Sequence, residues 1–222
     1  MRIMIIYATH KGGRYLPLSE SFRIQPEGKR NLYVNLTNRC DCSCTFCLRR
    51  LKKMAEESTL WLKQEPSVEE LQAEMEKVPW DMIGEVVFCG FGEPTSRLSV
   101  LVEMLRYVKE QHPGMPTRLN TNGLGELAYG REISEEFRGI LDTISISLNA
   151  SNAEKYLALT NAKYGIRSYE AMLAFAEHSK KHVPNVVLTI VDHVNPPEEI
   201  EKCRRLCEDR GLTLRVRSYE DS

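Results

Sequence analysis

The sequence predicts an α/β fold with parallel strands, in the form of a partial (β/α)6 barrel of the TIM type. Short apolar segments of strand length recur along residues 32–216, and helical patterns fall between them. Strands that alternate with helices form right-handed crossovers, which make the sheet parallel. The 222 residues are few for a closed eight-fold barrel, which takes about 250. A doubly wound sheet would fit the same alternation.

Residues 1–30 are expected to form an N-terminal extension, and residues 31–222 a core domain. The extension begins with an apolar segment over residues 3–7. Turn signals follow at Gly12-Gly13 and at Pro26-Glu27-Gly28, so a hairpin is the simplest interpretation.

The core domain is expected to hold six strands separated by helices of ten residues or more. Strands are expected over residues 32–37, 84–89, 118–123 with its turn, 143–148, 186–191 and 212–216. Helices are expected from residue 67, over 98–108, over 133–141, from residue 151, over 168–181 and over 197–210. Two of these helix starts carry the spacing of a capping box, Ser67 with Glu70 and Ser151 with Glu154.

Composition limits the functional classes. The net charge of −1 and the pI of about 6.5 give no general attraction to nucleic acid or to an anionic membrane. No apolar stretch approaches the ~20 residues that span a bilayer, and the first residues do not resemble a signal peptide. The 7 cysteines are an odd number with four crowded together, which fits a reducing cytoplasm better than a disulfide framework. We therefore expect a cytoplasmic protein without a membrane segment.

The most informative stretch follows the first core strand. Cys40, Cys44 and Cys47 have the spacing Cys-x-x-x-Cys-x-x-Cys, and Phe46 precedes the last thiol. Three thiolates can each bind one iron of a [4Fe–4S] cluster, whereas a fully ligated cluster needs four. The fourth iron would be open to a ligand that reacts. Cys42 is then a spare thiol for which no role is expected.

A structural zinc site is the alternative for these cysteines, because tetrahedral thiolate coordination suits Zn²⁺. Cys40, Cys42 and Cys44 are too close in sequence to share one tetrahedron without strain. Structural zinc also usually pairs ligands from two separate knuckles, and the sequence has no second knuckle. The spacing favours the cluster.

Polar and glycine-rich segments follow the next three strands, at the ends where parallel α/β folds gather reactive groups. Glycines there let the backbone approach a ligand closely, and a carboxylate can accept a hydrogen bond from an amine. The candidates are Gly90, Gly92 and Glu93 after the second strand, Asn122 after the third, and Ser147 and Asn149 after the fourth. We expect them to share one face with the cysteines.

The cysteine motif resembles the signature of radical S-adenosylmethionine (SAM) enzymes, and residues 90–94 resemble their second-strand Gly-Gly-Glu motif. The segments 35–40, 88–95, 119–123 and 144–150 are similar to TatD-nuclease-associated radical SAM proteins. The similarity covers most of residues 31–220 and little of residues 1–30. Phe91 departs from the commoner motif by replacing its first glycine. The fifth strand lacks the Gly-x-Ile-x-Gly-x-x-Glu pattern.

The resemblance implies two cofactors. Cys40, Cys44 and Cys47 would ligate a [4Fe–4S] cluster, and S-adenosyl-L-methionine would chelate its open iron. Phe46 would lie against the adenine. The remaining candidates would hold the amino group (Gly90, Gly92, Glu93) and the ribose or carboxylate (Ser147, Asn149, Asn122).

The activity implied by the resemblance is reductive cleavage of SAM to a 5′-deoxyadenosyl radical, which takes hydrogen from a substrate. The sequence does not identify that substrate, which is a small molecule or a macromolecule. Reduction at low potential implies an external donor, a flavodoxin or ferredoxin. The basic run Arg49, Arg50, Lys52 and Lys53 could dock it, but a solvated basic helix face is the simpler interpretation.

Several functions stay open from the sequence. A glycyl-radical-enzyme activase and a deazapurine-synthase-like enzyme are both compatible with a short barrel. Outside the enzyme class, a non-catalytic iron–sulfur electron-transfer protein and a zinc-binding module would use the same cysteines. Asp192 and His193 follow the fifth strand and could move a proton, although plain loop residues are the simpler interpretation.

Overall fold

The computed structural model describes residues 4–10, 14–51 and 60–218. Within these residues the strands form one eight-stranded sheet in the order β2-β1-β3-β4-β5-β6-β7-β8. The strands are β1 (Ile6–His10), β2 (Arg14–Pro17), β3 (Arg30–Val34), β4 (Ile83–Phe88), β5 (Thr117–Thr121), β6 (Thr143–Ser147), β7 (Asn185–Val191) and β8 (Thr213–Arg217).

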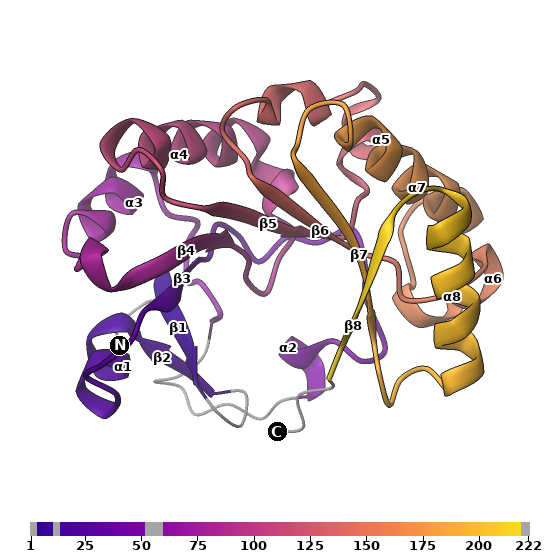
Figure 1. Cartoon of the computed structure of the whole chain (residues 1–222), viewed down its shortest axis with the longest axis horizontal. Helices are drawn as coiled ribbons and strands as arrows, with labels where there is room; N and C mark the ends of the chain where they lie inside the picture. Colours follow the sequence, from indigo (N-terminus) through magenta and orange to yellow (C-terminus); the bar gives the residue numbers. More distant parts are fainter. Residues whose placement is uncertain (1–3, 11–13, 52–59, 219–222) are drawn as a thin grey trace.

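Strands β3 to β8 pair in parallel and follow one another across the sheet in chain order. A doubly wound sheet would reverse its strand order at a switch point, so this order excludes it and confirms the partial barrel. The sheet curves into an arch whose edges are β2 and β8 (Figure 1).

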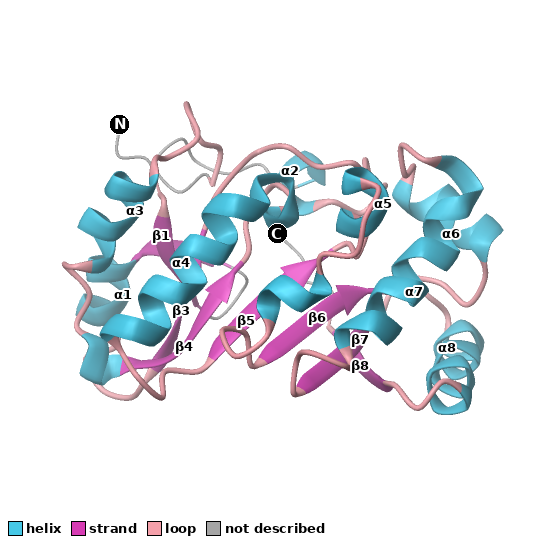
Figure 2. Cartoon of the chain, turned by 90° about the horizontal axis from the view of Figure 1, so that it is seen from above, coloured by secondary structure: helices cyan, strands magenta, loops and turns pink. Residues whose placement is uncertain are grey.

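Most helices lie over the convex side of the arch, as the view from above shows (Figure 2), whereas the short α2 lies at its open side (Figure 1). The helices are α1 (Leu18–Ile24), α2 (Leu48–Leu51), α3 (Val68–Met75), α4 (Leu98–Gln111), α5 (Gly125–Tyr129), α6 (Ala153–Thr160), α7 (Ser168–Ser179) and α8 (Pro197–Asp209). Short 3-10 turns cover Trp80–Met82, Pro94–Arg97, Ser134–Phe137 and Gly165–Arg167. None of the described helices has the length and hydropathy to cross a membrane.

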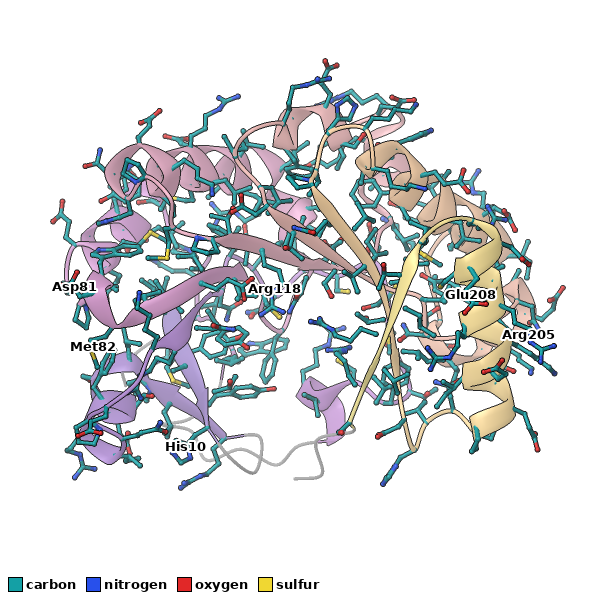
Figure 3. All side chains as sticks on the ribbon, viewed as in Figure 1. His10, Asp81, Met82, Arg118, Arg205 and Glu208 are labelled. Carbon is teal, nitrogen blue, oxygen red and sulfur yellow. The ribbon has the colours of Figure 1, made fainter. Side chains whose placement is uncertain are left out.

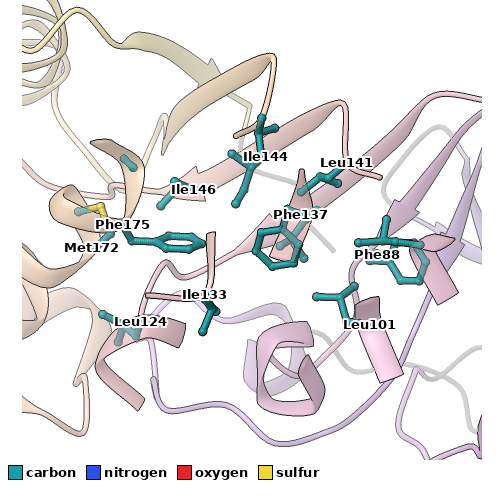
Figure 4. Packing of buried hydrophobic residues seen from close by; sticks show 14 of the residues in the cluster. Phe88, Leu101, Leu124, Ile133, Phe137, Leu141, Ile144, Ile146, Met172 and Phe175 are labelled. Atoms are coloured by element: carbon teal, nitrogen blue, oxygen red, sulfur yellow. The ribbon is translucent and has the colours of Figure 1, made fainter. Parts of the chain in front are cut away.

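The core lies between the sheet and these helices. Alternate strand residues such as Phe88 and Ile144 are fully buried there, where they pack with Phe137 and Phe175 from the outer layer (Figure 4). Because side chains alternate across a strand, the residues between them turn to the concave side. Arg118 is one of these, and its side chain lies within the hollow of the arch (Figure 3). The alternation therefore separates an apolar layer from a polar inner face.

The N-terminal strands extend the same sheet. β1 pairs antiparallel with both β2 and β3, so the described part of residues 1–30 is continuous with the parallel strands through hydrogen bonds. The Gly12-Gly13 turn lies outside the described residues. The division of the chain into an extension and a core domain stays a prediction.

The helices differ from expectation in three places. The helix expected over 133–141 is only the turn Ser134–Phe137, because Gly139 has a left-handed φ of 74°. The second capping box is wrong by one residue: the Asn152 side chain caps α6 by accepting from Lys155 N, 3.0 Å away. Ser151 N instead donates to Glu199 Oε1 at 2.8 Å. The expected length of ten residues or more is also wrong for α3 and α6, which have eight residues each.

The capping box at α3 is present and gives a test of the fold. Ser67 Oγ accepts from Glu70 N at 3.2 Å, and Glu70 Oε2 accepts from Ser67 N at 2.8 Å. We expect Ser67→Ala to lower the free energy of unfolding by about 1 kcal/mol, because it leaves a helix N–H without its acceptor. Ser99→Ala, on the exposed face of α4, should change it by less than about 0.5 kcal/mol. Equal effects in urea denaturation would contradict the assigned cap.

Candidate functional site

A cavity of about 690 Å³ opens where the carboxyl ends of β3 to β6 meet the cysteine loop. Its lining includes every residue that the sequence identifies as a site candidate. These are Cys40, Cys44, Phe46, Cys47, Gly90, Gly92, Glu93, Asn122, Ser147 and Asn149. Four segments far apart in the sequence thus contribute to one concave site.

The cysteine loop is held from outside by the end of α6. Ser43 N donates to Thr160 O at 2.8 Å, and Thr45 N donates to Leu159 O at 2.9 Å. These bonds satisfy backbone groups of the loop and carbonyls at the helix end. A third bond, from Lys163 N to Asp41 O at 2.9 Å, extends the seam. The loop can therefore turn its thiols into the cavity while its backbone is fixed behind them.

A second anchor lies on the other side of the loop, in the segment before α3. The Arg39 guanidinium donates to both Glu65 oxygens, at 2.8 and 3.0 Å, and Thr37 Oγ1 also donates to Glu65. The Asn38 side chain forms two hydrogen bonds with the backbone of Leu62, at 2.7 and 3.0 Å. The residues just before Cys40 are thereby fixed in position.

The four thiols of the loop differ in environment, and all seven cysteines of the chain are free. Hydrogen bonds from the Cys42 thiol lower the pKa of Cys40 and of Cys44, and Arg49 acts in the same direction. The same hydrogen bonds raise the pKa of Cys42, and burial raises the pKa of Cys47. Cys42 is 5% exposed and lines the same cavity. The thiol expected to be spare therefore lies beside the proposed ligands.

The thiols of the loop fit an iron–sulfur cluster. Cys40, Cys44 and Cys47 line one cavity. A [4Fe–4S] cluster takes one thiolate at each iron, so its ligands need not converge on one point. These three thiols could therefore hold three irons of such a cluster.

Gly90 and Gly92 are required by the close approach of two chain segments. A Cβ at Gly90 would lie 2.0 Å from Asn35 Oδ1. A Cβ at Gly92 would lie 2.3 Å from the backbone oxygen of Thr37 and 2.6 Å from that of Arg39. The loop after β4 therefore runs directly against the segment that leads into Cys40. The same contact includes a hydrogen bond from Glu93 N to Arg39 O at 2.7 Å.

The Glu93 carboxylate is buried, with 5% of the residue exposed, and it joins two of the loops. Oε1 accepts from Thr95 N at 3.1 Å, Thr95 Oγ1 at 2.9 Å and Thr121 Oγ1 at 2.7 Å. Oε2 accepts from Asn122 N at 2.6 Å. Burial raises the pKa of Glu93, and these donors oppose that shift. Oε1 already accepts three hydrogen bonds, whereas Oε2 accepts one and has one acceptor position left for a ligand amine.

Asn122 connects this carboxylate to the thiols. Its side-chain nitrogen lies 3.8 Å from Cys40 Sγ and 3.7 Å from Cys42 Sγ. Its side-chain oxygen accepts from Leu124 N at 2.9 Å, which fixes the orientation of the amide. Amide donors to sulfur are a means by which proteins tune iron–sulfur clusters.

Ser147 and Asn149 lie where β6 ends. The backbone nitrogens of Leu148 and Asn149 donate to Thr189 O on β7, at 2.9 and 3.3 Å. Asn149 has a φ of 62°, a left-handed conformation that asparagine tolerates better than most residues. This bend ends the strand and brings Ser147 and Asn149 into the cavity lining.

Arg49 belongs to the site, although the sequence suggested a solvated basic face. Its guanidinium donates to Asn38 O at 3.2 Å and to Cys42 O at 3.4 Å, so that expectation is wrong for Arg49. Lys52 and Lys53 lie outside the described residues. The position two residues after Cys47 was the only sequence signal for this role. His193, by contrast, is an exposed loop residue outside the cavity lining, with 79% of its side chain accessible.

Comparison with known proteins shows that the sequence matches a family model. The model of the radical SAM superfamily matches residues 34–207. GTP 3′,8-cyclase from Corynebacterium glutamicum is 27% identical, over 94% of this chain and 55% of that protein. GTP 3′,8-cyclase 2 from Mycobacterium tuberculosis is 28% identical, over 84% of this chain and 49% of that protein. The chain thus spans about half the length of the curated relatives it matches.

Solved structures share the fold at low sequence identity. SuiB from Streptococcus suis, bound to S-adenosylmethionine, superposes with a TM-score of 0.62 at 16% identity, over 90% of this chain and 42% of that one. A radical SAM methyltransferase from Sphaerobacter thermophilus superposes with a TM-score of 0.59 at 18% identity, over 96% of this chain and 61% of that one.

The contact at Gly92 can be tested by substitution. We expect Gly92→Ala to lower the free energy of unfolding by about 1–3 kcal/mol, because the Cβ meets backbone atoms that cannot swing aside. Gly84→Ala on β4 is the matched control, since its nearest neighbour would be 3.6 Å away, an ordinary contact. The measurement is urea denaturation of both variants. A Gly92→Ala protein as stable as the control would show that the loop does not need this approach.

Proposed function

The chain belongs to the radical SAM superfamily, and we propose that it is an enzyme that cleaves SAM reductively to abstract hydrogen from a substrate. The observation that carries the proposal is the shared cavity of the Cys40, Cys44 and Cys47 thiols with the Gly92-Glu93 loop. The family uses a [4Fe–4S] cluster and SAM, and when bound these supply hydrogen abstraction by a 5′-deoxyadenosyl radical.

In this proposal the three thiolates hold the cluster, and the chain's other residues position SAM. Gly90 and Gly92 allow the backbone to approach the methionine amino group. Glu93 Oε2 uses its free acceptor position to accept a hydrogen bond from that amino group. The contacts from Thr95, Thr121 and Asn122 keep the carboxylate in place for that role.

The remaining candidates would meet the other parts of SAM. Phe46, on the cysteine loop, would lie against the adenine. Ser147 and Asn149, at the end of β6, would meet the ribose hydroxyls or the carboxylate, and Asn122, whose amide lies near the Cys40 thiol, would assist them. Their common lining of the cavity supports these assignments.

Electron supply and location follow from the same chemistry. A cluster of this kind needs a low-potential donor, and we propose a flavodoxin or ferredoxin. We place the protein in the cytoplasm, because its seven free thiols suit a reducing compartment. The finer resemblance to TatD-nuclease-associated proteins stays a prediction. So does the substrate, because the relatives named GTP 3′,8-cyclase are matched over about half their length.

SAM cleavage tests the proposal directly. After anaerobic reconstitution with iron and sulfide, the wild-type protein should form 5′-deoxyadenosine from SAM when dithionite is added. Cys40→Ala, Cys44→Ala and Cys47→Ala should each lose most of the iron and the cleavage, because each removes one of three ligands. Cys42→Ala should keep its iron content. Cys207→Ala, on the buried face of α8, should keep both the iron and the cleavage.

Two other outcomes would favour the other functional classes. A stable cluster without 5′-deoxyadenosine would indicate a non-catalytic iron–sulfur protein. Stoichiometric zinc that iron cannot replace would indicate a zinc-binding module.

Asn122 gives an independent test of the thiol environment. We expect Asn122→Ala to lower the reduction potential of the cluster on the order of tens of mV, because an N–H donor near sulfur stabilises the more negative, reduced state. Asn152→Ala, a helix-cap change on α6, is the control and should leave the potential unchanged. Redox titration followed by electron paramagnetic resonance measures both. An unchanged or higher potential in Asn122→Ala would contradict the contact.

A further inference from the structure

The cavity extends beyond the proposed cofactor residues into the concave face of the sheet. This second part, open along the edge strand β8, is lined by Arg118 on β5, Arg215 and Arg217 on β8, and by tyrosines from β1, β2 and β3. None of these side chains is among the residues assigned above to the cluster or to SAM. The concave side therefore has a second, chemically distinct lining.

Strand register explains why arginines from distant strands meet here. Thr189 on β7 pairs with both Ser147 on β6 and Arg215 on β8, which places Arg215 in the row of concave-facing residues. Arg217 follows two residues later on the same strand, so its side chain points to the same side. The Arg215 guanidinium reaches back across the arch and donates to Ser145 Oγ on β6 at 3.1 Å.

The charges of this lining do not balance. Among its described residues the cavity has four arginines but a single carboxylate, Glu93, which is engaged near the cysteines. Arg118 forms an ion pair with Glu85 of β4 at 2.7 Å, and the Glu85 carboxylate also attracts Arg215. Arg49 is bound to backbone carbonyls of the cysteine loop. With Glu85 included, the arginines still outnumber the carboxylates, and the excess positive charge lies at Arg215 and Arg217, both exposed on the edge strand β8.

The two cations destabilise each other in the absence of an anion. Partial burial and the charges of Arg118 and Arg217 lower the pKa of Arg215, and the Glu85 carboxylate opposes that shift without cancelling it. Like charges held together cost free energy, which an anionic ligand offsets on binding. Guanidinium groups suit this purpose because their fork of N–H donors matches the oxygens of phosphate and carboxylate.

An aromatic wall faces these arginines. The rings of Tyr7 and Tyr33 stack with centroids 5.2 Å apart, and Tyr15 packs edge-on against Tyr7 at 5.5 Å. Tyr7 and Tyr15 are 2% and 8% exposed and the Tyr7 hydroxyl donates to Cys89 O, so the half-buried Tyr33 offers most of the accessible ring surface. Cationic groups on one side and aromatic rings on the other suit a small molecule with a charged end and an apolar or planar body.

We propose that this second part of the cavity binds the substrate, and that the substrate is a small molecule whose phosphate or carboxylate groups are held by Arg215 and Arg217. That the bound molecule is the substrate rests on the function proposed above, whereas anion binding by Arg215 and Arg217 does not depend on SAM cleavage. The anion site and the proposed function can therefore be disproved separately.

Calorimetry on the reconstituted protein tests the inference with two probes, pyrophosphate and citrate, at fixed ionic strength. We expect one probe to bind. Binding of pyrophosphate alone indicates a phosphate-bearing substrate, and binding of citrate alone a carboxylate-bearing one. The double variant Arg215→Gln with Arg217→Gln should weaken that binding by at least about tenfold. Arg205→Gln should not change it, because Arg205 lies on the outer face of α8 beside Glu201 (Figure 3).

A charge-preserving variant separates recognition from misfolding. Arg215→Lys with Arg217→Lys should retain binding within a few-fold, because lysine still binds such anions as a point charge. The inference is overturned if neither probe binds the wild type, if the glutamine variant binds as tightly, or if saturating SAM displaces the probe. Probe binding without any 5′-deoxyadenosine from the wild type would overturn the proposed function and leave the anion site standing.

Discussion

The buried carboxylate of Glu93 is the group on which the geometry of the site depends. A carboxylate that is 5% exposed is costly unless donors surround it, and here four hydrogen bonds do so. Those donors come from the start of the following 3-10 turn and from the end of β5. One side chain thus fixes the loops after two neighbouring strands. Asn122, whose backbone it holds, then reaches the thiols of the cysteine loop.

Most of the architecture follows from local patterns in the sequence. Short apolar segments, continuous over residues 186–191 and alternating with polar residues over 143–148, predicted the six parallel strands. The helix over 133–141 was wrong because Gly139 interrupts a good apolar pattern with a left-handed turn. The missed cap of α6 has a different cause. Glu199, a residue 48 positions away, accepts from Ser151 N and leaves Asn152 to begin the helix. Contacts of that range cannot be read from local spacing.

The site residues also fall into those that local sequence patterns predicted and those that depend on long-range contacts. Thiol spacing and the ends of the strands located every candidate residue, since parallel folds bring those ends together. The spacing placed Arg49 close after Cys47, but it did not indicate that Arg49 would bind the carbonyls of Asn38 and Cys42, or that Glu65 would anchor Arg39. A sequence does not show which backbone carbonyls accept hydrogen bonds from side chains. Arg217 ends the sixth strand, and that position already indicated the reactive face, whereas Arg215 lies within the strand and no local pattern singled it out.

The antiparallel start of the sheet has a consequence for how this molecule could diversify. Tyr7 and Tyr15 precede residues 34–207, which the family model matches, yet they line the same chamber as the cysteines. Changes in those first strands would alter what the chamber admits without replacing any of the residues proposed to hold the cluster or SAM. Selectivity and cofactor binding thus draw on different stretches of the chain.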